Sequence, residues 1–107
     1  MVAYLTRVEL YGDDQAPGDY IRLHEEMEKR KFHRTIVADN GQRVHLPTAE
    51  YHSYGELSAA EVEALAVQAC NAIGYVTWPG TAGRITRLCA VLVTQASAFK
   101  WIGLRSA

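Results

Sequence analysis

The side chains best suited to acid–base chemistry near neutral pH are the four histidines of this chain: His24, His33, His45 and His52. No two of them have the i, i+4 spacing with which a helix holds a metal ion, so we predict no zinc site. A single imidazole beside a cation can still cleave RNA, because it accepts the 2′-hydroxyl proton while the cation stabilises the phosphorane. His24 follows Leu23 at the edge of an apolar helical stripe, which makes it either a groove-facing catalytic group or an ordinary surface histidine.

Two adjacent carboxylates offer a second kind of chemistry. Asp13 and Asp14 follow the first apolar stretch directly, and Pro17 comes three residues later. Carboxylate oxygens are the ligands that Mg²⁺ prefers, and this ion commonly takes only one or two of them from protein. Gly, Asp and Pro are also the residues that build ordinary turns. A magnesium-dependent site and a simple turn therefore both remain open for this pair.

Positive charge dominates the C-terminal part of the sequence. All 12 acidic residues lie at or before Glu63, whereas four of the 11 basic residues follow it. Such a distribution indicates either an anionic partner or a solvated surface. Tyrosines accompany the basic residues, and bases of single-stranded RNA stack on such rings while cations follow the phosphates. The side chains that we expect to contact nucleic acid are Arg34, Arg43, Arg84 and Arg87.

Length and composition predict one globular domain over residues 1–107. A chain of 107 residues that is 49% hydrophobic can build a core without metal or disulfide support. No apolar stretch approaches the roughly 20 residues that cross a bilayer, and the N-terminus alternates too regularly for a signal peptide. Cys70 and Cys89 are far apart in the sequence, which predicts buried, reduced thiols in a cytoplasmic protein. No GxGxxG, Walker or GxSxG motif is present, so we expect no cofactor other than Mg²⁺.

Hydrophobic periodicity predicts six elements in the order strand, helix, strand, strand, helix, strand. Residues 4–10 alternate as a half-buried strand does. We expect the first helix to run from an N-cap at Asp19 to about Lys31. The second helix begins at a capping box on Ser58 and stops at Gly74, a residue that commonly ends helices.

The remaining segments complete the expected order. An Asn-Gly turn predicts a hairpin between residues 35–39 and 49–55. Residues 75–83 are expected to form a loop, and residues 85–94 form the most continuous apolar run, typical of a strand buried on both sides or paired in an interface. The tail over residues 99–104 is too apolar to remain in water, so we expect it to dock on its own domain or on a second copy.

This order of elements predicts an α+β, ferredoxin-like βαββαβ fold with an extra C-terminal apolar tail. Right-handed crossovers would place both helices on one face of a four-stranded antiparallel sheet. The other face of the sheet is left bare, and dimerisation is the usual way to cover it. We therefore expect a homodimer.

The stretch from Met27 to Leu65 also carries a family resemblance. The aromatic Phe32 precedes Ile36-Val37-Ala38-Asp39, and Ala59-Ala60-Glu61 opens the second helix. In these features the chain resembles the GhoS-type antitoxins, small ferredoxin-fold endoribonucleases that cleave a toxin messenger RNA. The resemblance implies the ferredoxin-like fold and RNA cleavage. It also implies catalytic roles for Arg22 and His24, which lie at basic positions of the first helix linked to cleavage in that family; His24 stands where the family has an arginine.

Two functional hypotheses follow. The first is a cytoplasmic, homodimeric domain of bacterial or phage origin that binds messenger or other single-stranded RNA, either without cleaving it or as an endoribonuclease that resembles an antitoxin of this kind. The second is a non-enzymatic, dimeric ferredoxin-like module that binds a protein partner through its bare sheet face and its tail. The residues alone leave both open.

Overall fold

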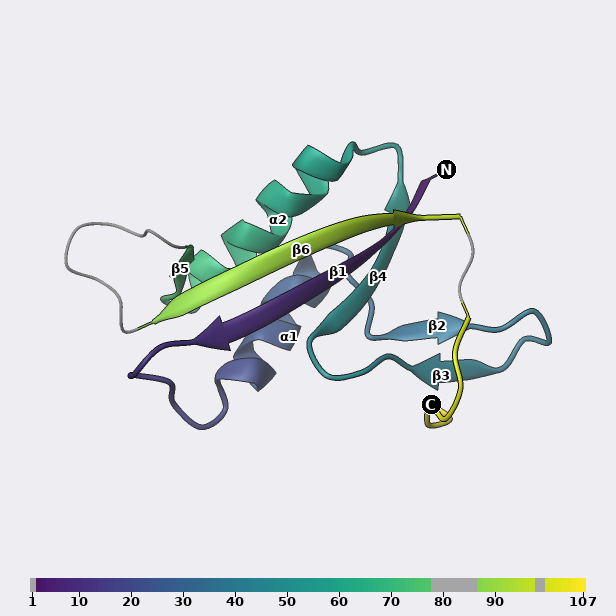
Figure 1. The fold of residues 1–107 in the computed structure, drawn as a ribbon, viewed down its shortest axis with the longest axis horizontal. Helices are drawn as coiled ribbons and strands as arrows, with labels where there is room; N and C mark the ends of the chain where they lie inside the picture. Colours follow the sequence, from purple (N-terminus) through teal and green to yellow (C-terminus); the bar gives the residue numbers. More distant parts are fainter. Residues whose placement is uncertain (1, 78–86, 98–99) are drawn as a thin grey trace.

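A computed structural model describes residues 2–77, 87–97 and 100–107 (Figure 1). The fold is α+β, with a four-stranded sheet, a separate strand pair and two helices. In chain order the elements are β1 (Val2–Tyr11), α1 (Asp19–Lys29), β2 (Thr35–Val37), β3 (Arg43–His45), β4 (Glu50–Gly55), α2 (Ala59–Ala72), β5 (Val76–Thr77) and β6 (Leu88–Ala96). No helix in the described ranges is both long enough and apolar enough to cross a membrane.

The four-stranded sheet is mixed, which corrects our prediction of an antiparallel sheet. Its order is β4-β1-β6-β5, and β1 pairs antiparallel with both β4 and β6. β5 pairs parallel with β6 and comes from the segment expected to be a loop. The physical cause is the turn after α2. Gly74 has a φ of +86°, which reverses the chain so that the Val76 N–H reaches the Arg87 carbonyl at 3.1 Å.

The predicted hairpin has a different second strand. The turn lies at Asn40-Gly41 as expected, but β2 pairs with the short β3, in a two-stranded sheet of its own. β3 was missed because it has only three residues, with a buried Val44 between two exposed neighbours. β4, which contains the expected partner residues, pairs with β1 instead. In Figure 1 the β2–β3 pair projects from the side of the main sheet.

The core lies between the sheet and the two helices. Alternate residues of β1 point inward, and α1 contributes Leu23 and Met27 to the same apolar cluster. α2 contributes Val62, Ala66, Ala69 and Cys70. Both cysteines are free and buried, as predicted. In Figure 1 both helices lie on the same side of the sheet.

The helix ends agree with the sequence for α2 and differ for α1. Ser58 forms the predicted capping box: its Oγ accepts from the Glu61 N–H at 3.2 Å, and its N–H donates to Glu61 Oε1 at 3.0 Å. For α1 the N-cap is Gly18, with a φ of +85°, and not Asp19, which is the first helical residue. The helix ends at Lys29, two residues earlier than expected.

The opposite sheet face is only partly apolar. β6 was expected to be buried on both sides or paired in an interface. In this domain only Leu88 and Cys89 of β6 are buried, while Ala90 is exposed and Leu92 keeps 63% of its surface exposed, so the first alternative is wrong and pairing in an interface stays a prediction. The chain end after the predicted tail is bonded to β3: the His45 N–H donates to the Arg105 carbonyl at 2.9 Å, and the Ala107 N–H donates to the Arg43 carbonyl at 3.0 Å. Within the tail itself Trp101 is 37% and Ile102 96% exposed, so its docking on this domain or on a second copy stays a prediction. Phe99 lies outside the described residues.

Candidate functional site

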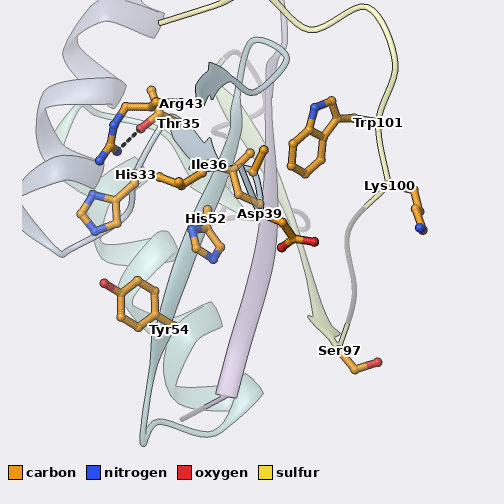
Figure 2. Close-up of a pocket in the computed structure, with 12 residues that line it drawn as sticks. His33, Thr35, Ile36, Asp39, Arg43, His52, Tyr54, Ser97, Lys100 and Trp101 are labelled. Atoms are coloured by element: carbon orange, nitrogen blue, oxygen red, sulfur yellow. Dashed lines mark hydrogen bonds between the residues drawn. The ribbon is translucent and has the colours of Figure 1, made fainter. Parts of the chain in front are cut away.

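A cleft of about 870 Å³ lies between the β2–β3 pair, β4 and the C-terminal segment (Figure 2). The β2–β3 hairpin forms one wall, and the side chains of Ser97, Lys100 and Trp101 contribute another. In Figure 2 the rings of His33, His52 and Tyr54 lie along one side, and the Trp101 ring lies across from them. The lining residues are His33, Thr35, Ile36, Val37, Ala38, Asp39, Arg43, His52, Tyr54, Ser97, Lys100 and Trp101.

Two histidines meet in this cleft. The His33 N–H donates to the His52 carbonyl at 2.8 Å, and the His52 N–H donates to the His33 carbonyl at 2.7 Å. Residues that exchange both bonds in an antiparallel pair have their Cα atoms about 5.5 Å apart and their side chains on one face. The backbone pairing therefore places both histidine side chains on the wall of the same cleft. Sequence spacing could not reveal it, because the two residues lie on different strand segments whose register only the fold sets.

His52 is held mainly in its neutral form. Burial lowers the pKa of His52, and the neighbouring His33 lowers it further. The Tyr54 ring packs beside it, with the two ring centroids 5.5 Å apart. A neutral imidazole near pH 7 can accept a proton, so His52 has the state that a general base requires.

The cleft also carries the charges that a phosphodiester would need. Arg43, one of the residues predicted to contact nucleic acid, lines it together with Lys100 and one carboxylate, Asp39. The Arg43 guanidinium donates to Thr35 Oγ1 at 3.0 Å, which fixes its position on the strand pair. Trp101 keeps 37% of its surface exposed, and Tyr54 57%. Two cations and two accessible rings thus line the same cleft as the two histidines.

His24 occupies a different environment from the one expected for a catalytic group. Its Nδ1 lies 2.7 Å from the hydroxyl oxygen of Tyr51, a residue with 0% exposure. Burial lowers the pKa of His24, and Arg34 lowers it further. Burial also raises the pKa of Tyr51, so the phenol stays protonated and is a permanent hydrogen-bond partner. His24 is thereby tied to the core side of β4.

The structure does not bring Arg22 to His24. Residues two apart on a helix point in different directions. Arg22 forms an ion pair with Asp19, in the first turn of α1. His24 contacts Tyr51 instead. The two residues that the family resemblance implies as catalytic therefore lie in separate environments.

Arg87 belongs to a network around the buried carboxylate of Asp19. Asp19 is 3% exposed; its Oδ2 accepts from the Tyr75 hydroxyl at 2.6 Å and lies 3.2 Å from Arg87 Nη2. The Arg87 guanidinium also donates to the Ile73 carbonyl at 3.1 Å and covers the Tyr75 ring at 4.5 Å. Arg87, expected to contact nucleic acid, is thus engaged in holding α1, α2 and the start of β6 together.

The other predicted residues lie apart from the cleft or outside the described ranges. Asp13 and Asp14 are exposed in the loop between β1 and α1, and the Asp14 carbonyl lies 3.5 Å from Arg87 Nη1. Magnesium binding there stays a prediction; within the described ranges, no three His, Cys, Asp or Glu side chains gather as they would around a metal. Arg34 is exposed, and its carbonyl accepts from the Leu46 N–H at 2.8 Å. Arg84 lies outside the described residues.

Comparison of this chain with protein-family models, curated proteins and solved structures finds no match. The resemblance to GhoS-type antitoxins therefore stays a prediction from the sequence.

Proposed function

We propose that this protein binds single-stranded RNA in the cleft between the β2–β3 pair and the C-terminal segment. The observation that carries the proposal is the combination of two cations, Arg43 and Lys100, with two accessible rings, Tyr54 and Trp101, around one cavity. Aromatic rings provide stacking surfaces for unpaired bases, and the cations compensate the phosphate charge.

The size of the cavity supports the same conclusion. Its volume of about 870 Å³ lies within the range of roughly 300–1,000 Å³ typical of sites for small organic ligands. A nucleotide with its flanking phosphates belongs to this size class. The rings and the cations come from two walls of the cleft, so a strand lying between them would touch both.

RNA affinity is tested by fluorescence anisotropy with a labelled single-stranded oligonucleotide at several salt concentrations. Trp101→Ala should weaken binding by about 1–3 kcal/mol, the usual value of one stacked base. Lys100→Ala should reduce the log–log salt slope by about 0.7, because one phosphate contact is lost. Lys29→Ala is the matched control: it removes a lysine whose side chain is 67% exposed outside the cleft. Equal effects of Lys100→Ala and Lys29→Ala would contradict the proposal.

We propose further that the fold is an elaborated form of the ferredoxin-like arrangement. In support, β1 lies between β4 and β6 and is antiparallel to both, while a helix precedes each of these two strands in sequence. β2 would then be the fourth strand of the βαββαβ order, and β3 and β5 would be additions to it. A solved structure in which β2 extends the main sheet beside β4 would fit this proposal best.

A second candidate function is self-association as a dimeric module. β5 covers only Leu88 and Cys89 of β6, so in the described part of the chain residues 90–96 have a strand neighbour on one side alone. These residues carry no charge, and Leu92 is 63% exposed. Uncharged strand edges are templates for pairing with another chain. Sedimentation at micromolar concentration should give twice the chain mass, and Leu92→Lys should restore the monomer; a monomeric wild type would refute the dimer.

A further inference from the structure

The two histidines of the cleft come from strand segments that backbone bonds hold together, N–H to carbonyl in both directions. Both side chains line the cleft (Figure 2), whose walls also carry Arg43 and Lys100, the cations proposed to bind phosphate.

We infer that His33 and His52 are the general acid and general base of an RNA-cleaving site. This inference rests on the proposed function, since the cleft must first bind a ribonucleotide strand. It differs from the site on α1 implied by the family resemblance, because the catalytic groups come from β4 and from the residue that leads into β2.

The reaction is an internal transesterification and needs no reactant beyond the RNA itself. His52 accepts the proton of the 2′-hydroxyl, and the 2′-oxygen attacks the adjacent phosphorus. The bond between phosphorus and the 5′-oxygen of the next nucleotide breaks, and His33 donates a proton to that oxygen. The products are a 2′,3′-cyclic phosphate and a 5′-hydroxyl. Arg43 and Lys100 stabilise the negative charge of the phosphorane.

The assignment of roles follows from the surroundings of the two rings. His52 is half-buried and His33 is exposed, so His52 is the ring for which the neutral form is favoured. The other charged or titratable groups on the cleft walls are Asp39, Arg43, Lys100 and Tyr54. Cleavage by this acid and base requires one protonated and one neutral ring, which gives a bell-shaped dependence of rate on pH.

The test separates binding from cleavage. A single-stranded RNA carrying a fluorophore is incubated with wild type, His33→Ala, His52→Ala and the control His45→Ala, with EDTA present. His45 is exposed on β3 and lies outside the cleft. Wild type and His45→Ala should form 2′,3′-cyclic phosphate ends, while each cleft variant should lose about 100-fold or more of the rate. Affinity for the same sequence with 2′-O-methyl groups, measured by anisotropy, should stay within about twofold in every variant.

Each outcome has one meaning. Wild type that binds the methylated strand but leaves RNA intact overturns the catalytic inference and keeps the proposed function. Wild type that binds neither strand overturns the proposed function itself. Cleavage that survives both cleft substitutions, or that His24→Ala or Arg22→Ala abolishes, refutes the assignment to His33 and His52. Should an alanine variant fail to fold, His33→Gln and His52→Gln replace it, because glutamine keeps hydrogen bonding but cannot shuttle protons near neutral pH.

Discussion

Tyr51 and His52 are neighbours on β4 but belong to two different regions of the molecule, the core beneath the helices and the cleft. Tyr51 points toward the helices, is fully buried and holds His24 through its hydroxyl at 2.7 Å. His52 points to the other face and meets His33 in the cleft. Successive strand residues face opposite sides of a sheet, so one step along β4 leads from the ring that contacts His24 to the ring that lines the cleft.

The comparison shows that two histidines with the same direction of pKa shift have different surroundings. Burial lowers the pKa of both His24 and His52, yet only His52 lies on the wall of a cleft that carries two cations. His24 is half-buried and bonded to the hydroxyl of Tyr51, whereas His52 lines the cleft together with His33. A titratable group with a shifted pKa in a cleft is a candidate for function.

The largest expected contrast is between two tyrosines of β4. Tyr51→Ala removes a fully buried ring and the partner of His24, so the free energy of unfolding should fall by about 3–5 kcal/mol. Tyr54→Ala removes a ring that is 57% exposed, so stability should change little while RNA affinity falls. Urea denaturation and anisotropy measure the two effects. Similar losses of stability in both variants would show that the two faces of β4 do not differ as described.

The next contrast separates two arginines that sequence analysis treated alike. Arg87→Ala leaves the buried Asp19 without one of its cations, and should cost about 1.5–3 kcal/mol of stability. Arg43→Ala acts at the surface and should change stability by less than about 0.5 kcal/mol. It should nevertheless weaken RNA binding, because Arg43 lines the cleft. The distinction fails if Arg87→Ala reduces RNA affinity without reducing the urea midpoint.

The smallest expected effect is on the pH dependence of stability. Folding lowers the pKa of His24 and His52, so between the folded and unfolded pKa values the unfolded chain binds more protons. The stability from these groups is present above about pH 6.5, the unfolded value, and is lost as the pH falls below it. Urea midpoints at pH 7.5 and 5.5 should therefore decrease with acidification. His24→Gln should reduce the decrease; a midpoint that rises on acidification would contradict the burial of these rings.

Much of the fold follows from the sequence where the pattern is local. The alternation of β1, the capping box at Ser58 and the Asn-Gly turn all depend on residues within a few positions of one another, and the structure contains each of them. The pairing of β5 with β6 depends on a turn at Gly74 and on residues far apart in the chain. The site is harder still to predict. His33 and His52 are brought together only by strand register, which no spacing rule reveals.

Of the arginines predicted to contact nucleic acid, Arg43 lines the cleft, whereas Arg87 contacts Asp19 elsewhere in the fold. Arg87 was predicted from charge alone, and its geometry around Asp19 and Tyr75 could not be deduced because those partners are distant in sequence. Asp19 itself was expected to cap α1. Its carboxylate is instead buried, where it accepts a hydrogen bond from the Tyr75 hydroxyl and forms ion pairs with Arg22 and Arg87.

The most direct test of the central claim is an NMR titration of the four histidine ring signals with a 2′-O-methyl single-stranded RNA. Because the analogue binds without being cleaved, it reports which imidazoles lie at the bound strand. We predict that the His33 and His52 signals shift with a shared affinity, while those of His24 and His45 stay in place. A shift of His24 without any change at His33 and His52 would contradict the assignment of the cleft as the RNA site.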